Sequence, residues 1–257
     1  MAEALAVEVG MHFFSLSLTS SPTPPLSPLP RPPSPLSPPP PSPFSLSSEV
    51  YKDAGVNLVT FDYSGYGASG GAPSVPGAVA DAAAALAWAL GGCGGGGLAL
   101  TPSDVVIYGQ SLGTGPATVL AARHPGLAGL VLHAGTTGAL RRRVDGRGGG
   151  GCPAPPHPPL SLDWAPHPDE AIPVAGLLPM TACPVLLVHG TADATNMHAE
   201  PVALAAVVGP ARGAFLSADG FGHDDVETRC PAYGPSLRAF LGRAFDGAGG
   251  GAVRAEE

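Results

Sequence analysis

A serine, an aspartate and a histidine of this chain have the types and the order needed for nucleophilic catalysis. Ser111 lies in a Gly-x-Ser-x-Gly frame that follows the apolar residues 105–108. A serine hydroxyl becomes an effective nucleophile when an imidazole accepts its proton, and that imidazole needs a carboxylate on its other nitrogen. We identify Asp193 as the carboxylate and His223 as the base. The chain order of serine, acid and histidine predicts acyl transfer through an acyl-serine intermediate.

Other titratable residues compete for these roles. His223 is preferred as the base because it lies in a glycine-flanked loop after the last expected strand, residues 214–216. Asp224 and Asp225 are too close to His223 in sequence to orient its ring easily, and we expect them at the start of the next helix. The histidines that we expect to be structural are His124, His133, His157, His167, His189 and His198.

The residues around Ser111 predict a strand, a sharp turn and a helix. The strand covers 105–108 and the helix 114–123. Such an elbow lifts a serine hydroxyl clear of the sheet. The flanking glycines are expected because a Cβ there would collide with a neighbouring strand or helix. The backbone N–H of Leu112 is then placed to donate to an oxyanion.

The rest of the chain predicts alternating strands and helices. Apolar runs at 56–63, 129–133 and 184–188 read as strands, and helices are expected at 79–90, 201–208 and 232–245. This alternation predicts a mostly parallel α/β sheet flanked by helices. Ligands bind outside the carboxyl ends of the strands in such sheets, where all three candidate catalytic residues would project. We expect the pocket rim to include Tyr63, Ser64, Gly65, Tyr66 and Gln110.

Gly65 to Gly70 also fits Gly-x-Gly-x-x-Gly after a strand, which could indicate a dinucleotide site. That motif must open a helix at once, and here residues 71–76 intervene. We therefore expect a tight loop at the pocket rim and no cofactor.

Four segments together carry a family resemblance. They are Phe61–Ser69, Tyr108–Pro116, Val131–His133 and Cys183–Asp193. They resemble plant and animal members of the alpha/beta-hydrolase domain-containing protein 17 family, over about residues 50–245. The resemblance implies an α/β-hydrolase fold with the nucleophile, acid and base at Ser111, Asp193 and His223. Animal members remove palmitate from proteins by thioester hydrolysis, so the implied substrate is a small acyl ester or an acylated protein.

The chain departs from this family ahead of residue 61. The family's first strands and a His-Gly-Asn loop are not found there, and that loop supplies the second oxyanion donor. Losing one such donor lowers turnover on the order of a hundredfold to a thousandfold. We therefore expect a gap at the centre of the sheet, between the strands of 56–63 and 105–108. The alternating residues 12–19 predict an edge strand or disorder. The alternative hypothesis is an inactive or truncated hydrolase relative that acts as a binding protein.

Composition divides the chain into four parts. Residues 1–21 form the amino-terminal segment, and 22–49 form a proline-rich arm that should be extended and solvated. The arm reads as a spacer or as a ligand for an SH3-type partner. Residues 50–246 form the hydrolase domain, with a cap-like insertion at about 135–181. Residues 247–257 are expected to be a disordered tail.

Charge and cysteine content bound the partners and the compartment. The formal net charge of −8 argues against nucleic acid. The four cysteines show no Cys-x-x-Cys spacing, so we expect neither a zinc site nor a disulfide framework, and a reduced, cytoplasmic compartment. No apolar run reaches the length of a transmembrane segment, and the first twenty residues lack the basic start of a secretory signal. The amino-terminal cysteine cluster that attaches animal family members to membranes is absent from this sequence.

Overall fold

The computed structural model describes residues 5–9, 15–18, 50–51, 53–66, 69–91, 97–138 and 172–248 of the chain. The proline-rich arm and most of the cap-like insertion lie outside these described residues, as does nearly all of the predicted tail.

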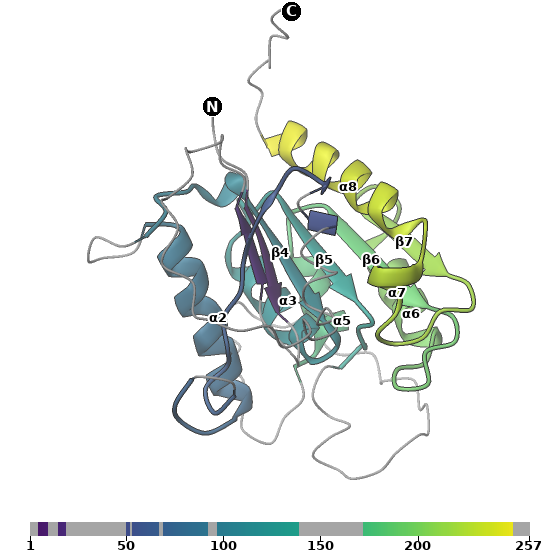
Figure 1. Ribbon diagram of the computed structural model, residues 1–257, viewed down its shortest axis with the longest axis horizontal. Helices are drawn as coiled ribbons and strands as arrows, with labels where there is room; N and C mark the ends of the chain where they lie inside the picture. The colour runs from purple at the N-terminus through teal and green to yellow at the C-terminus, as the bar shows by residue number, and fades with distance from the viewer. Residues whose placement is uncertain are drawn as a thin grey trace, which may run out of the picture.

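A seven-stranded sheet in the order β3-β2-β1-β4-β5-β6-β7 forms the centre of the molecule (Figure 1). The five neighbouring strands β1, β4, β5, β6 and β7 pair in parallel. β2 runs antiparallel to both of its neighbours, β1 and β3. The strands are β1 Leu5–Val9, β2 Ser15–Leu18, β3 Asn57–Val59, β4 Val105–Gln110, β5 Gly129–His133, β6 Val185–Gly190 and β7 Gly213–Ala218.

The amino terminus fills the centre of the sheet, so the expected gap is wrong. β1 pairs with β4 in parallel from Leu5 opposite Val105 to Val9 opposite Gly109. The expectation of an edge strand at residues 12–19 is also wrong, because β2 lies between β1 and β3. The physical reason is backbone pairing: β4 is buried, and its N–H and C=O groups need a partner strand on each side. Side-chain alternation carries no information about which strand supplies that partner.

Helices cover both faces of the sheet, and all the helices expected from the sequence are present. They are α2 Val75–Ala89, α3 Thr114–Arg123, α5 Val174–Leu177, α6 Ala199–Val208, α7 Val226–Arg229 and α8 Tyr233–Ala248. Short 3-10 turns occupy Pro102–Asp104, Ser111–Gly113 and Leu178–Met180. α2 starts where the Ser74 side chain accepts a hydrogen bond from the Gly77 N–H, and Gly91 follows its end with a φ of 88°.

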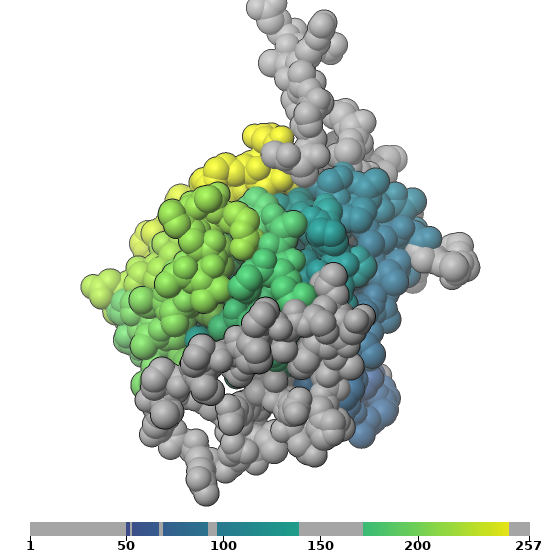
Figure 2. All heavy atoms as spheres, turned by 180° about the vertical axis from the view of Figure 1, so that it is seen from behind, coloured from purple at the N-terminus to yellow at the C-terminus, as the bar shows by residue number. Residues whose placement is uncertain are grey.

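Alternate strand residues pack into two separate core layers. Ile107, Leu130 and Leu187 face the layer that contains α2, α3 and α6. Val106 and Leu186 face the other layer, under α8. Figure 1 shows α8 lying across one face of the sheet, and Figure 2 shows the opposite side of the molecule. A strand that buries both of its faces must be apolar at every position, which is why β4, β5 and β6 read as continuous apolar runs. The predicted fold class is confirmed: a mostly parallel sheet flanked by helices.

Candidate active site

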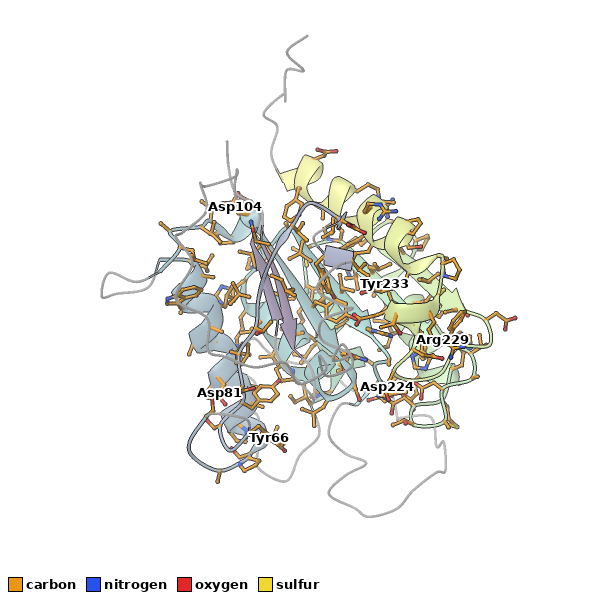
Figure 3. All side chains as sticks on the ribbon, viewed as in Figure 1. Tyr66, Asp81, Asp104, Asp224, Arg229 and Tyr233 are labelled. Atoms are coloured by element: carbon orange, nitrogen blue, oxygen red, sulfur yellow. The ribbon has the colours of Figure 1, made fainter. Side chains whose placement is uncertain are left out.

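The register of the sheet brings the three sequence-predicted catalytic residues to one edge. Gln110 of β4 is level with His133 of β5, which is level with Val188 of β6. Ser111 directly follows Gln110, the last residue of β4, and Asp193 follows the end of β6. His223 lies in the loop after β7. In Figure 3, Asp224, the neighbour of His223, lies at the opposite end of the sheet from Asp104, which precedes β4.

The turn that carries Ser111 has the strained geometry of a nucleophile elbow. The strand ends at Gln110, and Ser111 has a φ of 51°, a left-handed conformation that L-residues rarely adopt. The Thr114 hydroxyl donates to the Ser111 carbonyl at 2.6 Å and so closes the turn from the start of α3. A Cβ on Gly109 would lie 2.6 Å from the Gly113 carbonyl oxygen and 2.8 Å from the Ala117 Cβ. Glycine at 109 is therefore required by the close approach of strand and helix.

Asp193 and His223 form a direct hydrogen-bonded pair. The His223 Nδ1 lies 2.7 Å from the Asp193 Oδ2. The other carboxylate oxygen, Oδ1, accepts the backbone N–H groups of Thr195 at 2.7 Å and Asn196 at 2.8 Å. The Asp193 side chain is fully buried, whereas 14% of the His223 side chain is exposed, so the imidazole is the member of the pair that solvent can reach.

The electrostatic environment keeps the acid ionised. Burial by itself raises the pKa of Asp193. The hydrogen bond from His223 and the two backbone N–H donors lower that pKa by more than burial raises it, so the net pKa is below its ordinary value. An ionised carboxylate only accepts hydrogen bonds, so the proton of a neutral His223 is on Nδ1. Its Nε2 then carries no proton and can accept one, as a serine activator requires.

Two residues that sequence reasoning did not assign to the site support the acid. The His189 Nε2 lies 3.0 Å from the Asn196 carbonyl oxygen and 3.4 Å from the Asp193 Oδ2. The Asn196 side-chain amide donates to the Ala134 carbonyl at 2.7 Å. His189 is fully buried, and burial is the largest of the effects that lower its pKa. The available signal was the four-residue spacing from His189 to Asp193, and His189 is among the histidines expected from the sequence to be structural.

The loop that carries His223 is fixed on both sides. The Gly190 position, at the end of β6, is so close to the carbonyl oxygens of Phe221 and Gly222 that an added Cβ would collide with both. On the other side, Asp225 accepts the Gly222 N–H at 2.7 Å and is the N-cap of α7. The predicted position of Asp225 at a helix start is confirmed, and Asp224 is exposed.

The predicted rim residues divide into buried and exposed members. Tyr63 is 3% exposed and belongs to the core layer, so it does not line an open rim. Ser64 is held by Asp81 of α2, which accepts its N–H at 2.7 Å and its hydroxyl at 3.0 Å. Gly65 and Tyr66 are exposed, and Figure 3 shows Tyr66 and Asp81 on the same side of the molecule, near α2. Gln110 is half-buried at the end of β4.

The Gly-x-Gly-x-x-Gly segment has a different explanation from a dinucleotide site. Gly65 has a φ of 83°, and a Cβ there would lie 2.5 Å from the Pro73 ring. The next helix, α2, begins only at Val75. The described ends of the segment lie close together, because the Gly65 N–H donates to the Gly70 carbonyl at 2.9 Å, and Gly65 packs against Pro73.

Of the remaining described histidines, His124 is the C-cap residue of α3, and His133 and His198 have side-chain partners. The His198 Nε2 lies 2.7 Å from the Ser217 hydroxyl, and His133 contacts Tyr108 within the second core layer. His157 and His167 lie outside the described residues. Within the described ranges, no three metal-ligating side chains come together, and no helix is long and apolar enough to cross a membrane.

Curated relatives match about two thirds of the chain or slightly more. The alpha/beta hydrolase domain-containing protein aho-3 of Caenorhabditis elegans is 32% identical over 185 residues, 72% of this chain and 48% of that protein. The human alpha/beta hydrolase domain-containing protein 17B is 33% identical over 175 residues, 66% of this chain and 51% of that protein. The chain thus spans about half the length of the curated relatives it matches.

Solved structures share the fold. An esterase from Pyrococcus furiosus superposes with a TM-score of 0.56 at 16% identity, covering 78% of this chain and 76% of that one. No protein-family model matches the chain. The chain has the alpha/beta-hydrolase fold. Its resemblance to the alpha/beta hydrolase domain-containing protein 17 family is confirmed by the curated homologues.

Proposed function

We propose that the chain is a serine hydrolase that cleaves carboxylic esters or thioesters through an acyl intermediate on Ser111. The observation that carries the proposal is the 2.7 Å contact between His223 Nδ1 and Asp193 Oδ2, at the sheet edge where Ser111 follows β4 with a φ of 51°. A strained serine elbow and a buried carboxylate on an imidazole are the two parts of a catalytic triad that are hardest to explain otherwise.

The proposed reaction has two halves. The Ser111 hydroxyl attacks the carbonyl carbon while His223 Nε2 takes its proton, and Asp193 stabilises the imidazolium that forms. The carbonyl electrons move onto oxygen, where the Leu112 N–H donates to the oxyanion. The carbon–oxygen or carbon–sulfur bond then breaks, and the alcohol or thiol leaves with the proton from His223. Water repeats the sequence on the acyl-serine, releasing the carboxylic acid and regenerating Ser111.

The second oxyanion donor belongs to the loop that follows the strand beside the nucleophile strand in this fold class. Here β1 occupies that place in the sheet. The residues that follow it, 10–14, lie outside the described residues.

The substrate class is proposed from the family resemblance. Long-chain acyl thioesters, including palmitoylated cysteine in a peptide, would place their carbonyl at Ser111 in the same way as an ester. Turnover of a palmitoyl thioester and of a short p-nitrophenyl ester, compared at equal enzyme concentration, separates the two substrate types.

A fluorophosphonate probe tests the nucleophile directly. We expect the wild type to be labelled and Ser111→Ala to be unlabelled. The matched control is Ser103→Ala, because Ser103 is in the 3-10 turn at the other end of β4 and should not affect labelling. Folded wild-type protein that the probe leaves unmodified would reject the proposal and favour the inactive, binding relative. Retained esterase activity in His223→Ala would show that the base is wrongly assigned.

A further inference from the structure

A second cluster of buried polar side chains lies under α7 and α8, in the other core layer from α2. Glu227 of α7 is its centre, and the hydroxyls of three tyrosines point at one oxygen of its carboxylate. The Oη atoms of Tyr108, Tyr233 and Tyr51 lie 2.6, 3.0 and 3.3 Å from Glu227 Oε1. Each tyrosine is 1% exposed, and the Glu227 side chain is 8% exposed.

The three tyrosines come from three different parts of the chain. Tyr108 lies within β4, Tyr233 begins α8, and Tyr51 precedes β3. The tyrosine hydroxyls also lie 3.4 Å from one another in two pairs, Tyr51 with Tyr233 and Tyr233 with Tyr108. In Figure 3, Tyr233 lies near Arg229, the last residue of α7, which agrees with this packing.

Proton placement in the cluster follows from its donors. A tyrosine hydroxyl has one proton, and a carboxylate can only accept, so the 2.6 Å contact requires Tyr108 to donate to Glu227. The His133 Nδ1 lies 2.6 Å from the Tyr108 Oη and must then donate to it. The resulting chain runs from His133 of β5 through Tyr108 of β4 to Glu227 of α7. Hydrogen bonds linked in this way, out of water, hold their members in one arrangement.

Two members of this hydrogen-bonded chain are close in sequence to two candidate catalytic residues. Tyr108 stands three residues before Ser111, and Glu227 stands four residues after His223. The segment between His223 and Glu227 is held at its midpoint by Asp225, through Gly222 and Arg229. The buried hydrogen bond between Tyr108 and Glu227 thus connects the nucleophile strand to α7, the helix that directly follows the base loop, on the side of the sheet away from α2 and α3.

We infer that Glu227 and Tyr108 are positioning residues, and that their hydrogen bond fixes the distance between Ser111 and His223. This inference rests on the proposed function. Proton transfer between two side chains depends steeply on their separation, and a displacement of about 1 Å can lower the rate on the order of a hundredfold. We name this pair, Tyr108 and Glu227, the brace. Tyr51 shares the same acceptor but belongs to a segment without a candidate catalytic residue, so it contributes stability alone.

The rate of fluorophosphonate labelling tests the brace. We expect Tyr108→Phe to be labelled about tenfold to a hundredfold more slowly than wild type. Ester turnover should fall in the same variant through kcat, with KM unchanged. Glu227→Ala should lose at least as much, and Glu227→Gln, which keeps an acceptor oxygen, should recover most of the rate.

Tyr51→Phe is the matched control. It removes a tyrosine hydroxyl from the same acceptor as Tyr108→Phe does. If the cluster were purely structural, the two variants would lose labelling rate equally wherever they lose equal stability in urea unfolding. We expect its labelling rate to stay within about twofold of wild type, a change of under 0.5 kcal/mol in barrier height. Equal slowing by Tyr108→Phe and Tyr51→Phe, or wild-type labelling by Tyr108→Phe, would overturn the inference while leaving Ser111 as nucleophile.

Hydrogen exchange makes the test independent of catalysis. If the brace holds the base loop, amides of residues 220–226 should exchange faster in Tyr108→Phe than in Tyr51→Phe. Unchanged exchange in that segment contradicts the brace even if the probe labels no variant. Absence of labelling in the wild type, in contrast, counts against the proposed function itself.

Discussion

Ser111 is the residue at which local strain and proposed chemistry coincide. Its φ of 51° disfavours every residue with a Cβ by about 1–2 kcal/mol. The surrounding strand and helix impose this conformation. An L-residue at 111 therefore lowers the stability of the fold, and it places a half-buried serine at the elbow.

Replacement of Ser111 by glycine and by alanine separates strain from chemistry. We expect Ser111→Gly to be more stable than Ser111→Ala by about 1 kcal/mol, because glycine adopts positive φ without steric conflict. Both variants lack the hydroxyl, so neither should hydrolyse esters. Urea unfolding gives the free-energy difference, and a glycine variant less stable than the alanine variant would show that the elbow is unstrained.

The pKa of Asp193 makes a second prediction at this scale. The pKa is lowered in the folded state, mainly because donors from His223 and the backbone outweigh the effect of burial. The unfolded chain therefore binds this proton more readily, and the stabilising contribution is full above the ordinary carboxyl pKa of about 4. It is lost as the pH falls through the lower, folded-state pKa.

Asp193→Asn should accordingly be less stable than wild type near neutral pH, and the difference should shrink as the pH falls below about 4. Its turnover should fall on the order of 10⁴-fold, since an amide no longer favours the required imidazole tautomer. Urea unfolding of both proteins at a series of pH values measures the first effect. A stability difference that grows on acidification would contradict the depressed pKa.

At the scale of elements, the contact between the end of β6 and the loop that carries His223 leaves the least space for a larger side chain. Gly190 faces the carbonyl oxygens of Phe221 and Gly222 with no space for a Cβ. Gly190→Ala must therefore move the loop that carries His223. We expect a loss of labelling and turnover of at least tenfold, with the protein still folded, because a displacement of less than 1 Å suffices.

The control for this variant is Gly242→Ala. Gly242 lies on α8 with nothing within 4 Å of an added Cβ, and alanine is the better helix former by about 1 kcal/mol. It should be slightly more stable than wild type and equally active. Activity and circular dichroism of both variants give the comparison, and an active Gly190→Ala would show that the loop is not confined by β6.

At the scale of the whole molecule, β1 decides whether the sheet is continuous. It pairs with β2 on one side and with β4 on the other. The backbone N–H of Val7 therefore faces a neighbouring strand on either side of β1. Val7→Pro removes that donor and leaves an acceptor unpaired. We expect a loss of about 1–3 kcal/mol, with faster hydrogen exchange along Val105–Gln110.

Val7→Thr keeps the N–H and the β-branched shape, and it should leave exchange in β4 unchanged. Hydrogen-exchange mass spectrometry of the two variants distinguishes a ladder effect from a side-chain effect. Identical protection of β4 in wild type and Val7→Pro would mean that β1 does not complete the sheet.

The sequence by itself predicted the strands β4 to β7 and the helices α2, α3, α6 and α8, whereas α5 lies in the stretch expected to be a cap-like insertion. Short continuous apolar runs between turn residues are typical of strands buried on both faces, and glycine marks the turns between them. Chain order also placed Ser111, Asp193 and His223 at one edge, since parallel strands present their carboxyl ends together. Local pattern suffices for such features because each depends on residues within one element and its immediate flanks.

Only the tertiary structure decided which strand lies beside β4, and which side chains support the candidate catalytic residues. Leu5–Val9 joins the sheet through backbone hydrogen bonds, and these leave no trace in side-chain periodicity. Glu227 lies 119 residues after Tyr108, and Tyr63 lies in a rim segment yet packs into the core. Contacts between distant segments follow from how helices stack on a twisted sheet, so residue type and spacing along the chain do not encode them individually.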